Sequence, residues 1–197
     1  MNPPAPILVA AINARHSHAS MGARCLLANL GDLRPQAALA EFTIQQSASE
    51  IAAAIAARQP RILGLGVYIW NAARVAELLP LLRHKLPDIK IVLGGPEIPA
   101  RGRAGSISGD FRSDGDPTPS SGGCPCVDLA DFLILGEGDL AFAALCREIL
   151  AGRPTERILH PAPPALAEIQ LPYDEYTDAD LAQRLLYVES SRGCAMR

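Results

Sequence analysis

The sequence predicts an α/β protein with a doubly wound parallel sheet. Short apolar runs alternate with amphipathic stretches through the first two-thirds of the chain, which is the pattern of repeated strand–helix–strand units. The predicted strand Arg61–Val67 is apolar on both faces, as expected of a central parallel strand. Glycines also gather where three of the predicted strands end, which is typical of tight turns and of close backbone approach to a ligand.

Five strands are predicted, and helices follow the first, second, third and fifth of them. The strands are expected at Ile7–Ile12, Glu41–Gln45, Arg61–Val67, Lys90–Leu93 and Asp131–Leu135. The helices are expected to bury Ala23, Leu26, Leu27 and Leu30, then Ile51, Ala54 and Ile55, then Ala72, Val75, Ala76 and Leu79, and finally Phe142, Leu145, Cys146 and Ile149. Ser47 and Glu50 have capping-box spacing, and Asn71 is expected to cap the third helix. The elements together predict a flavodoxin-like (Rossmann-like) doubly wound sheet of five parallel strands.

Two segments lack the pattern of this core. Residues 101–125 are rich in Gly, Ser, Asp and Pro and are predicted to form a flexible insertion in a first domain, 1–152. Residues 153–183 are predicted to be a Pro-rich linker without regular helix, which makes a Pro-rich C-terminal extension. Leu185–Ser190 then has the composition of one more strand, for which no partner strand remains in the chain.

Charge and composition argue against several classes of function. The net charge is −3, the isoelectric point is about 5.8, and Lys and Arg are scattered, so no nucleic-acid surface is expected. No apolar run approaches the ~20 residues needed to span a bilayer, and the N-terminus lacks the basic start of a secretory signal. Five cysteines without a secretory context are expected to be reduced thiols, so a cytoplasmic location is predicted.

The candidate site lies in the loops that follow the strands, because open parallel sheets bind ligands beyond the carboxyl ends of their strands. These loops are 13–22, 66–71, 94–97 and 136–139. In the first of them, His16 and His18 flank a serine, and a neutral imidazole at this position is able to bind a metal.

The end of the chain holds its most specific pattern. Ser191-Arg192-Gly193-Cys194 follows the last predicted strand and resembles the start of the cluster loop of radical S-adenosylmethionine enzymes. Upstream, Gly-Gly-Pro-Glu at 94–97 and Gly-Glu-Gly-Asp at 136–139 each follow a predicted strand. With the Pro-rich linker, this order resembles the cobalamin-binding radical S-adenosylmethionine family over almost the whole chain, apart from the insertion.

The resemblance implies that the first domain holds cobalamin over the strand ends, with the nucleotide tail alongside the sheet. The implied cofactor-binding residues all come from the strand-end loops: Asn13, His16, His18, Ser20, Gly22, Gly66, Tyr68, Gly94, Gly95, Pro96, Glu97, Gly136, Glu137 and Gly138. Better-known cobalamin domains use Asp-x-His-x-x-Gly, but here Ala19 stands three residues before Gly22 and the loop has no aspartate. Base-off binding is therefore predicted, with His18 as a candidate cobalt ligand.

The resemblance also sets an expectation for the radical chemistry. Complete members hold a [4Fe–4S] cluster through C-x-x-x-C-x-x-C, and this cluster binds S-adenosylmethionine. Only the first cysteine, Cys194, is present, so residues 184–197 are expected to be the start of a truncated radical domain, inactive alone. A separately encoded radical S-adenosylmethionine domain is then the expected partner. Methyl transfer, rearrangement or cyclisation is the reaction implied for complete relatives.

Other functions are weighed against this interpretation. A flavodoxin-like module for a flavin or another nucleotide requires a phosphate loop rich in Ser, Thr and Gly after the first strand, where the chain offers only Ser17 and Ser20. A non-functional truncated remnant is a further alternative. A receiver-type signalling module is disfavoured, because Asn13 ends the first strand and Gly66 the third, where acidic residues are required.

Overall fold

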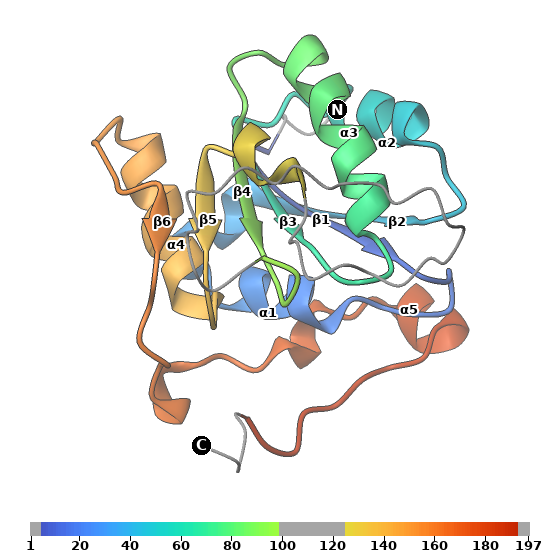
Figure 1. Ribbon diagram of the computed structural model, residues 1–197. Helices are drawn as coiled ribbons and strands as arrows, with labels where there is room; N and C mark the ends of the chain where they lie inside the picture. The colour runs from blue at the N-terminus through green and yellow to red at the C-terminus, as the bar shows by residue number, and fades with distance from the viewer. Residues whose placement is uncertain (1–4, 99–124, 193–197) are drawn as a thin grey trace, which may run out of the picture.

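Parallel strands form a single sheet with helices on both of its faces (Figure 1). The computed structural model describes residues 5–98 and 125–192. The six strands are β1 (Ile7–Asn13), β2 (Ala37–Thr43), β3 (Ile62–Gly66), β4 (Lys90–Gly94), β5 (Phe132–Ile134) and β6 (Ile158–Leu159). They lie in the order β2-β1-β3-β4-β5-β6, and every pairing is parallel. The first five follow the flavodoxin-like order, which confirms the predicted fold class.

Two pairs of helices cover the two faces of the sheet. Helices α1 (Met21–Ala28) and α4 (Asp139–Leu150) lie on one face, and α2 (Ala48–Ala56) and α3 (Ala72–Lys85) lie on the other (Figure 1). The connections contain the 3₁₀ turns Gly31–Gln36, Pro125–Leu129, Leu166–Glu168 and Pro172–Glu175 and the short helix α5 (Asp178–Gln183). Because side chains alternate along a strand, β1 sends Leu8, Ala10 and Ile12 to the α2/α3 layer and Ile7, Val9 and Ala11 to the α1/α4 layer. Apolar residues on both faces thus give β1 its nearly continuous burial.

Two strands differ from the sequence-based prediction. Strand β2 begins at Ala37, whereas the sequence predicted a start at Glu41. The prediction missed the first half of the strand because that half is rich in alanine, which has little strand preference of its own. Strand β6 is an addition to the five predicted strands, and it lies in the segment predicted to be a linker. It has two residues, too few to show a periodic pattern, and Leu135 N donates to Leu159 O (2.9 Å) at its end.

The C-terminal extension also differs from the prediction. Helix α5 lies within the segment expected to lack helix. It starts with a capping box between Thr177 and Asp180, beyond Pro172, the last proline of this segment. Leu185–Ser190 does not form a strand. Leu185 instead makes a single parallel bridge with His18, and its amide donates to Ser17 O (2.7 Å). The prediction that this segment forms a strand was therefore wrong, and its pairing is the one bridge to the loop after β1. The expected insertion lies outside the described residues apart from Pro125.

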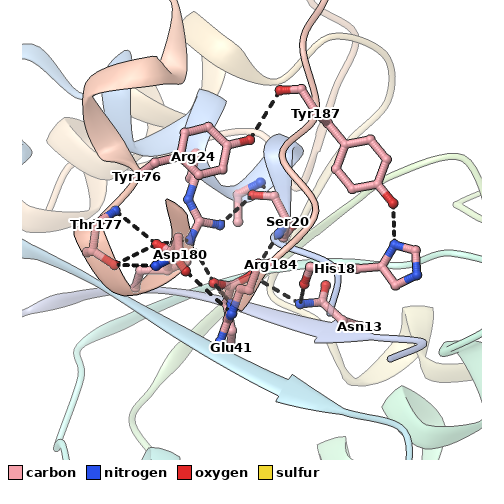
Figure 2. Close-up of polar contacts among 12 residues, drawn as sticks. Asn13, His18, Ser20, Arg24, Glu41, Tyr176, Thr177, Asp180, Arg184 and Tyr187 are labelled. Atoms are coloured by element: carbon pink, nitrogen blue, oxygen red, sulfur yellow. Dashed lines mark hydrogen bonds and ion pairs between the residues drawn. The ribbon is translucent and has the colours of Figure 1, made fainter. Parts of the chain in front are cut away.

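A buried group of charged side chains joins the extension to the sheet (Figure 2). Arg24 of α1 is 1% exposed, and its Nη2 lies 2.8 Å from Oε2 of Glu41 in β2 and 2.9 Å from Oδ2 of Asp180 in α5. Arg184 Nη1 lies 2.6 Å from the same oxygen of Glu41. The Tyr176 ring packs on the Arg24 guanidinium, with 4.6 Å between the ring centroid and Cζ. Two positive and two negative charges are thus paired out of water, as buried charges require.

Glu41 is the centre of this group. Its Oε1 accepts hydrogen bonds from Ser20 N (2.7 Å) and Asn13 Nδ2 (3.0 Å), while Oε2 faces the two arginines. Burial acts to raise the pKa of Glu41, but its hydrogen bonds and the charge of Arg24 hold the pKa below its ordinary value of 4.5. Glu41 is therefore charged at neutral pH and fixes β2, α1, the loop after β1 and the C-terminal extension relative to one another.

Acid is expected to weaken the fold through Glu41. Since the folded-state pKa lies below 4.5, the carboxylate stabilises the fold fully above pH 4.5, and this contribution is lost as the pH falls through the folded-state pKa. Glu41→Gln is expected to lower the free energy of unfolding at neutral pH by about 3–5 kcal/mol, because two buried arginines lose their shared counter-charge. The variant should also show a smaller loss of stability in acid. Urea unfolding over a series of pH values from neutral to well below the ordinary pKa of Glu41 measures both effects.

Glu77→Gln is the matched control for this prediction. Glu77 is a 59% exposed side chain that pairs with Arg74 at 2.6 Å on the surface of α3. Loss of such an exposed pair is expected to cost no more than about 1 kcal/mol. Equal losses of stability in the two variants would contradict a central role for Glu41.

Two adjacent glycines after β4 are expected to respond differently to alanine. Gly95 has a φ of +105°, and a Cβ there would lie 2.5 Å from Val67 O, whereas a Cβ at Gly94 would meet Ile134 O at an ordinary 3.5 Å. Gly95→Ala is expected to lower the free energy of unfolding by about 1–3 kcal/mol, and Gly94→Ala to change it little. Chemical denaturation of both variants tests this, and a stable Gly95→Ala protein would show that the turn is not strained.

Candidate functional site

A cavity of about 700 Å³ opens at the carboxyl ends of the strands. It starts at Asn13, Gly66 and Gly94, the last residues of β1, β3 and β4, and continues past Gly64 and Val92 on the face covered by α1 and α4. The sheet order reverses between β1 and β3, which is the position where open α/β sheets bind ligands. The volume lies in the range of small-molecule and cofactor sites.

The structure brings most of the sequence-predicted residues together in this cavity. Its lining includes ten of the fourteen: Asn13, His18, Ser20, Gly22, Gly66, Tyr68, Gly94, Gly95, Gly136 and Gly138. They come from the loops after β1, β3, β4 and β5, so the rule that parallel strand ends share one edge placed them correctly.

The two loop histidines are separated by a turn. His18 N donates to Arg15 O (3.2 Å), and this turn places His16 in a smaller cavity of about 310 Å³ beside Thr43 and Arg184. His16 therefore lies outside the main cavity, although it was expected there with His18.

Three further predicted residues lie outside the cavity lining. After Gly95 the chain folds back, so that Glu97 N donates to Val67 O (3.3 Å) and Pro96 is exposed to solvent. Glu137 has its carboxylate 3.7 Å from Arg192 Nη1. The sequence could not show these departures, because they depend on the direction of single turns.

Buried polar contacts hold the strand-end loops in place. Asn13 Nδ2 donates to His18 O (2.8 Å), which fixes the backbone of the histidine, and Ser20 Oγ caps α1 by accepting from Ala23 N (3.3 Å). Asn71 occupies the N-cap position of α3 as expected, but its side chain makes no capping bond. Being 1% exposed, it instead donates to Ile12 O and Gly66 O (both 3.1 Å). Asn71 thus ties the ends of β1 and β3 together at the edge of the cavity.

Aromatic rings form part of the cavity wall. Tyr68 and Trp70 stack with their centroids 4.6 Å apart and their planes 7° apart, and Trp70 Nε1 donates to Ile12 O (3.2 Å). A Cβ at Gly22 or Gly66 would lie 2.9 Å from an atom of Tyr68, so these two glycines make room for the ring. Trp70 was missed at the sequence level, although an aromatic residue just after a strand exit is a usable signal.

The C-terminal extension supplies the opposite wall through Tyr187, Glu189 and Arg192. Arg192 lies 2.9 Å from Asp139 at the start of α4 and 2.8 Å from Glu189. The hydrogen bonds that Arg192 donates to Glu189, together with the Asp139 carboxylate, raise the pKa of Arg192 above its ordinary value, although burial opposes this. Sequence reasoning missed all three wall residues, because the fold, and no local pattern, brings this segment to the strand-end loops, as in the contacts of Tyr187 with His18 and of Arg192 with Asp139.

The cavity lining includes a thiol, Cys25, and an imidazole, His18. Burial raises the pKa of Cys25 to about 11, so this thiol in the wall stays protonated at neutral pH and is a poor nucleophile or metal ligand. His18 is the imidazole in the lining. Within residues 5–98 and 125–192 there is no group of three or more His, Cys, Asp or Glu that could hold a metal ion, and Cys194 lies outside this range. None of the helices in the described part is long and apolar enough to cross a membrane.

Comparison with known proteins gives two relatives among characterised enzymes. The 2-(S-pantetheinyl)-carbapenam-3-carboxylate methyltransferase of Streptantibioticus cattleyicolor is 34% identical over 105 residues, which cover 53% of this chain and 12% of the enzyme. The cobalamin-dependent radical SAM methyltransferase TokK of Streptomyces tokunonensis is 30% identical over 109 residues, which cover 55% of this chain and 13% of TokK. The matched segment is thus a small part of each relative.

A solved structure and a protein family also match. A cobalamin-binding protein from Desulfitobacterium hafniense aligns with 72% of this chain and 57% of its own, with a TM-score of 0.44 and 14% identity. The family described as B12 binding domain matches residues 7–112, a stretch that contains β1 to β4 and the loops at their ends. Because this match covers more than half of the sequence, the chain belongs to the B12-binding domain family.

Proposed function

We propose that the strand-end cavity holds cobalamin in the base-off form. The observation that supports this most directly is the course of the cavity, which starts across the strand ends and continues between the sheet and its helices past Gly64 and Val92. Cobalamin has a broad corrin ring and a narrow nucleotide tail. The mouth of the cavity suits the ring, and its extension along the sheet suits the tail.

The residues present fit such a ligand. At the mouth, Asn13, His18 and Ser20 offer polar groups, and the stacked pair Tyr68 and Trp70 offers a flat apolar surface for the ring. Along the sheet, glycines without side chains allow the nucleotide tail to approach the backbone closely. These glycines are Gly94, Gly95, Gly136 and Gly138. When bound, cobalamin supplies a cobalt centre that is able to relay a methyl group.

We further propose that the chain is the cobalamin-binding part of a cytoplasmic radical S-adenosylmethionine methyltransferase. The names of the relatives support this proposal, since both are methyltransferases and TokK is a cobalamin-dependent radical SAM enzyme. The aligned segment covers 12% and 13% of their lengths. The proposed division is a cobalamin domain at 1–152, a linker at 153–183 and the start of a radical domain at 184–197, with Cys194 as a first cluster ligand. The [4Fe–4S] cluster and S-adenosylmethionine are proposed to belong to a radical S-adenosylmethionine domain that acts together with the cobalamin domain.

The proposed binding predicts a simple spectroscopic result. The purified chain mixed with hydroxocobalamin and then desalted is expected to retain the corrinoid, with the absorbance spectrum of a base-off form. A colourless protein fraction from a chain shown to be folded by circular dichroism would contradict cobalamin binding. The same experiment with flavin mononucleotide tests the flavodoxin-like alternative, and a folded chain that retains neither ligand would favour a non-functional remnant.

Gly94→Ala is expected to weaken cobalamin retention about tenfold or more without unfolding the protein. The added methyl group enters the cavity wall, where a Cβ has only an ordinary contact with Ile134 O at 3.5 Å, and one methyl group in a tight site is commonly worth this much. Glu97→Gln is the matched control, since Glu97 is in the same loop but outside the cavity lining. Titration of both variants with hydroxocobalamin measures the difference, and equal affinities would place the tail elsewhere.

A further inference from the structure

The cavity becomes apolar where it leaves the strand ends and continues between the sheet and the helices α1 and α4. The described side chains that line this part belong to the hydrophobic core of that layer, and three of them, Val9, Val92 and Phe142, are no more than 2% exposed. The sheet contributes Val9, Ala11, Val92 and Ile134, and the helices contribute Leu26 and Phe142. A ligand group in this part of the cavity is therefore surrounded by hydrocarbon.

The backbone of this apolar part is already hydrogen-bonded. Strand β1 lies between β2 and β3, and β4 lies between β3 and β5, so the amide and carbonyl groups of Val9 and Val92 are used within the sheet. The Phe142 ring packs on β3, where a Cβ on Gly64 would lie 2.7 Å from it. A bridging water needs two or more polar partners, and these apolar walls do not supply them.

Polar side chains of the lining lie at the strand ends and beside the C-terminal extension. Asp139 of α4 and Cys25 of α1 both face Arg192 of the extension, since the Asp139 carboxylate lies 2.9 Å from Nη1 and the Cys25 thiol lies 3.9 Å from Nη2. Asn71 is bonded to Ile12 O and Gly66 O. These groups are directed away from the apolar part of the cavity.

One hydroxyl remains available at the entrance to the apolar part. The Tyr68 hydroxyl points to the start of α1, where it would lie 2.9 Å from a Cβ on Gly22. It makes no hydrogen bond with any residue in the described ranges 5–98 and 125–192. Burial raises the pKa of Tyr68, so the hydroxyl keeps its proton and is able to donate it. A ligand with a single acceptor can be satisfied here, whereas one with several polar groups cannot.

Natural corrinoids share the corrin ring and differ in the base at the end of the nucleotide tail. In cobalamin this base is dimethylbenzimidazole, whose outer edge carries only methyl and C–H groups and which has one free ring nitrogen in the base-off form. Other corrinoids carry adenine, which has an amine and additional ring nitrogens. The two bases are of similar size, so a wall that distinguishes them does so by polarity.

We propose that the apolar part of the cavity selects corrinoids with a benzimidazole base over corrinoids with adenine. The inference rests on the proposed function and names the class of corrinoid that the site takes. Adenine would bury an amine and ring nitrogens without partners among Val9, Val92 and Phe142, and unpaired buried polar groups are costly. Dimethylbenzimidazole places methyl groups there, and its one free nitrogen is matched by the one available hydroxyl of Tyr68.

The test is equilibrium dialysis of the folded chain against cobalamin, against pseudocobalamin, which carries adenine, and against cobinamide, which lacks the nucleotide. The wild-type chain is expected to bind cobalamin at least about tenfold more tightly than pseudocobalamin, since one unpaired polar group in an apolar pocket commonly has an effect of this size. This preference is expected even though dimethylbenzimidazole binds its own cobalt more firmly than adenine does and so resists the base-off form.

Val92→Thr tests the wall itself, because it replaces a methyl group by a hydroxyl of similar size. The hydroxyl offers adenine a partner and meets dimethylbenzimidazole without one, so the ratio of cobalamin to pseudocobalamin affinity is expected to fall about tenfold. Val75→Thr is the matched control, since Val75 is 0% exposed but packs on the other face of the sheet, outside the cavity lining. It is expected to keep the wild-type ratio. Comparing ratios between variants cancels the properties of the free corrinoids, and circular dichroism verifies that both variants fold.

The possible outcomes separate this selection from cobalamin binding as such. A wild-type ratio near one, or a ratio that Val92→Thr changes no more than Val75→Thr does, would overturn the selection and leave cobalamin binding intact. Cobinamide bound as tightly as cobalamin would also overturn it, because the tail would then contribute nothing. A folded chain that binds none of the three corrinoids would overturn both the selection and the proposed function.

Discussion

The buried carboxylate of Glu41 is the contact on which the arrangement of the cavity depends. It satisfies two buried arginines, the amide of Ser20 and the side chain of Asn13 at once. Desolvating this many charges is costly, and the cost is offset only because each group has an ion-pair or hydrogen-bond partner. Removing one member leaves the others unpaired. The apolar core stabilises the sheet, and this polar group determines how the loop after β1 and the C-terminal extension meet at the edge of the sheet.

A second constraint comes from the glycines beside the large rings. The rings of Tyr68 and Phe142 lie where a Cβ on Gly22, Gly66 or Gly64 would stand, at separations of 2.9, 2.9 and 2.7 Å. The sequence analysis assigned strand-end glycines to close approach by a ligand. The structure shows that two of those predicted, Gly22 and Gly66, line the cavity and also make room for the ring of Tyr68. Only Gly95 and Gly136, with φ of +105° and +112°, are required by backbone conformation at this edge.

The parts of the fold that depend on local pattern could be read from the sequence. The burial of β1 and β3 and the capping box at Ser47 follow from neighbouring residues, and so does the meeting of loops at one sheet edge. Strand β6 and the contacts of Tyr187 and Arg192 could not be read in this way. They are fixed by partners 25 to 169 positions away, and no periodicity in the sequence records them. Exposed apolar residues such as Leu185 and Val188 also give their segment the composition of a strand, although its strand-like pairing is the one bridge at Leu185.

The position of Tyr187, Glu189 and Arg192 in the cavity wall has a consequence for biosynthesis. Strands β1 to β4 are complete within the first 94 residues, so the centre of the sheet is able to pair while the rest of the chain is still being translated. Glu41 and Arg24 are both translated by this stage, whereas their partners Asp180 and Arg184 follow much later in the chain. A nascent chain therefore has a sheet and an open edge before it has an enclosed site. The wall that Tyr187, Glu189 and Arg192 add to the cavity is therefore completed only after the sheet that it faces has been translated.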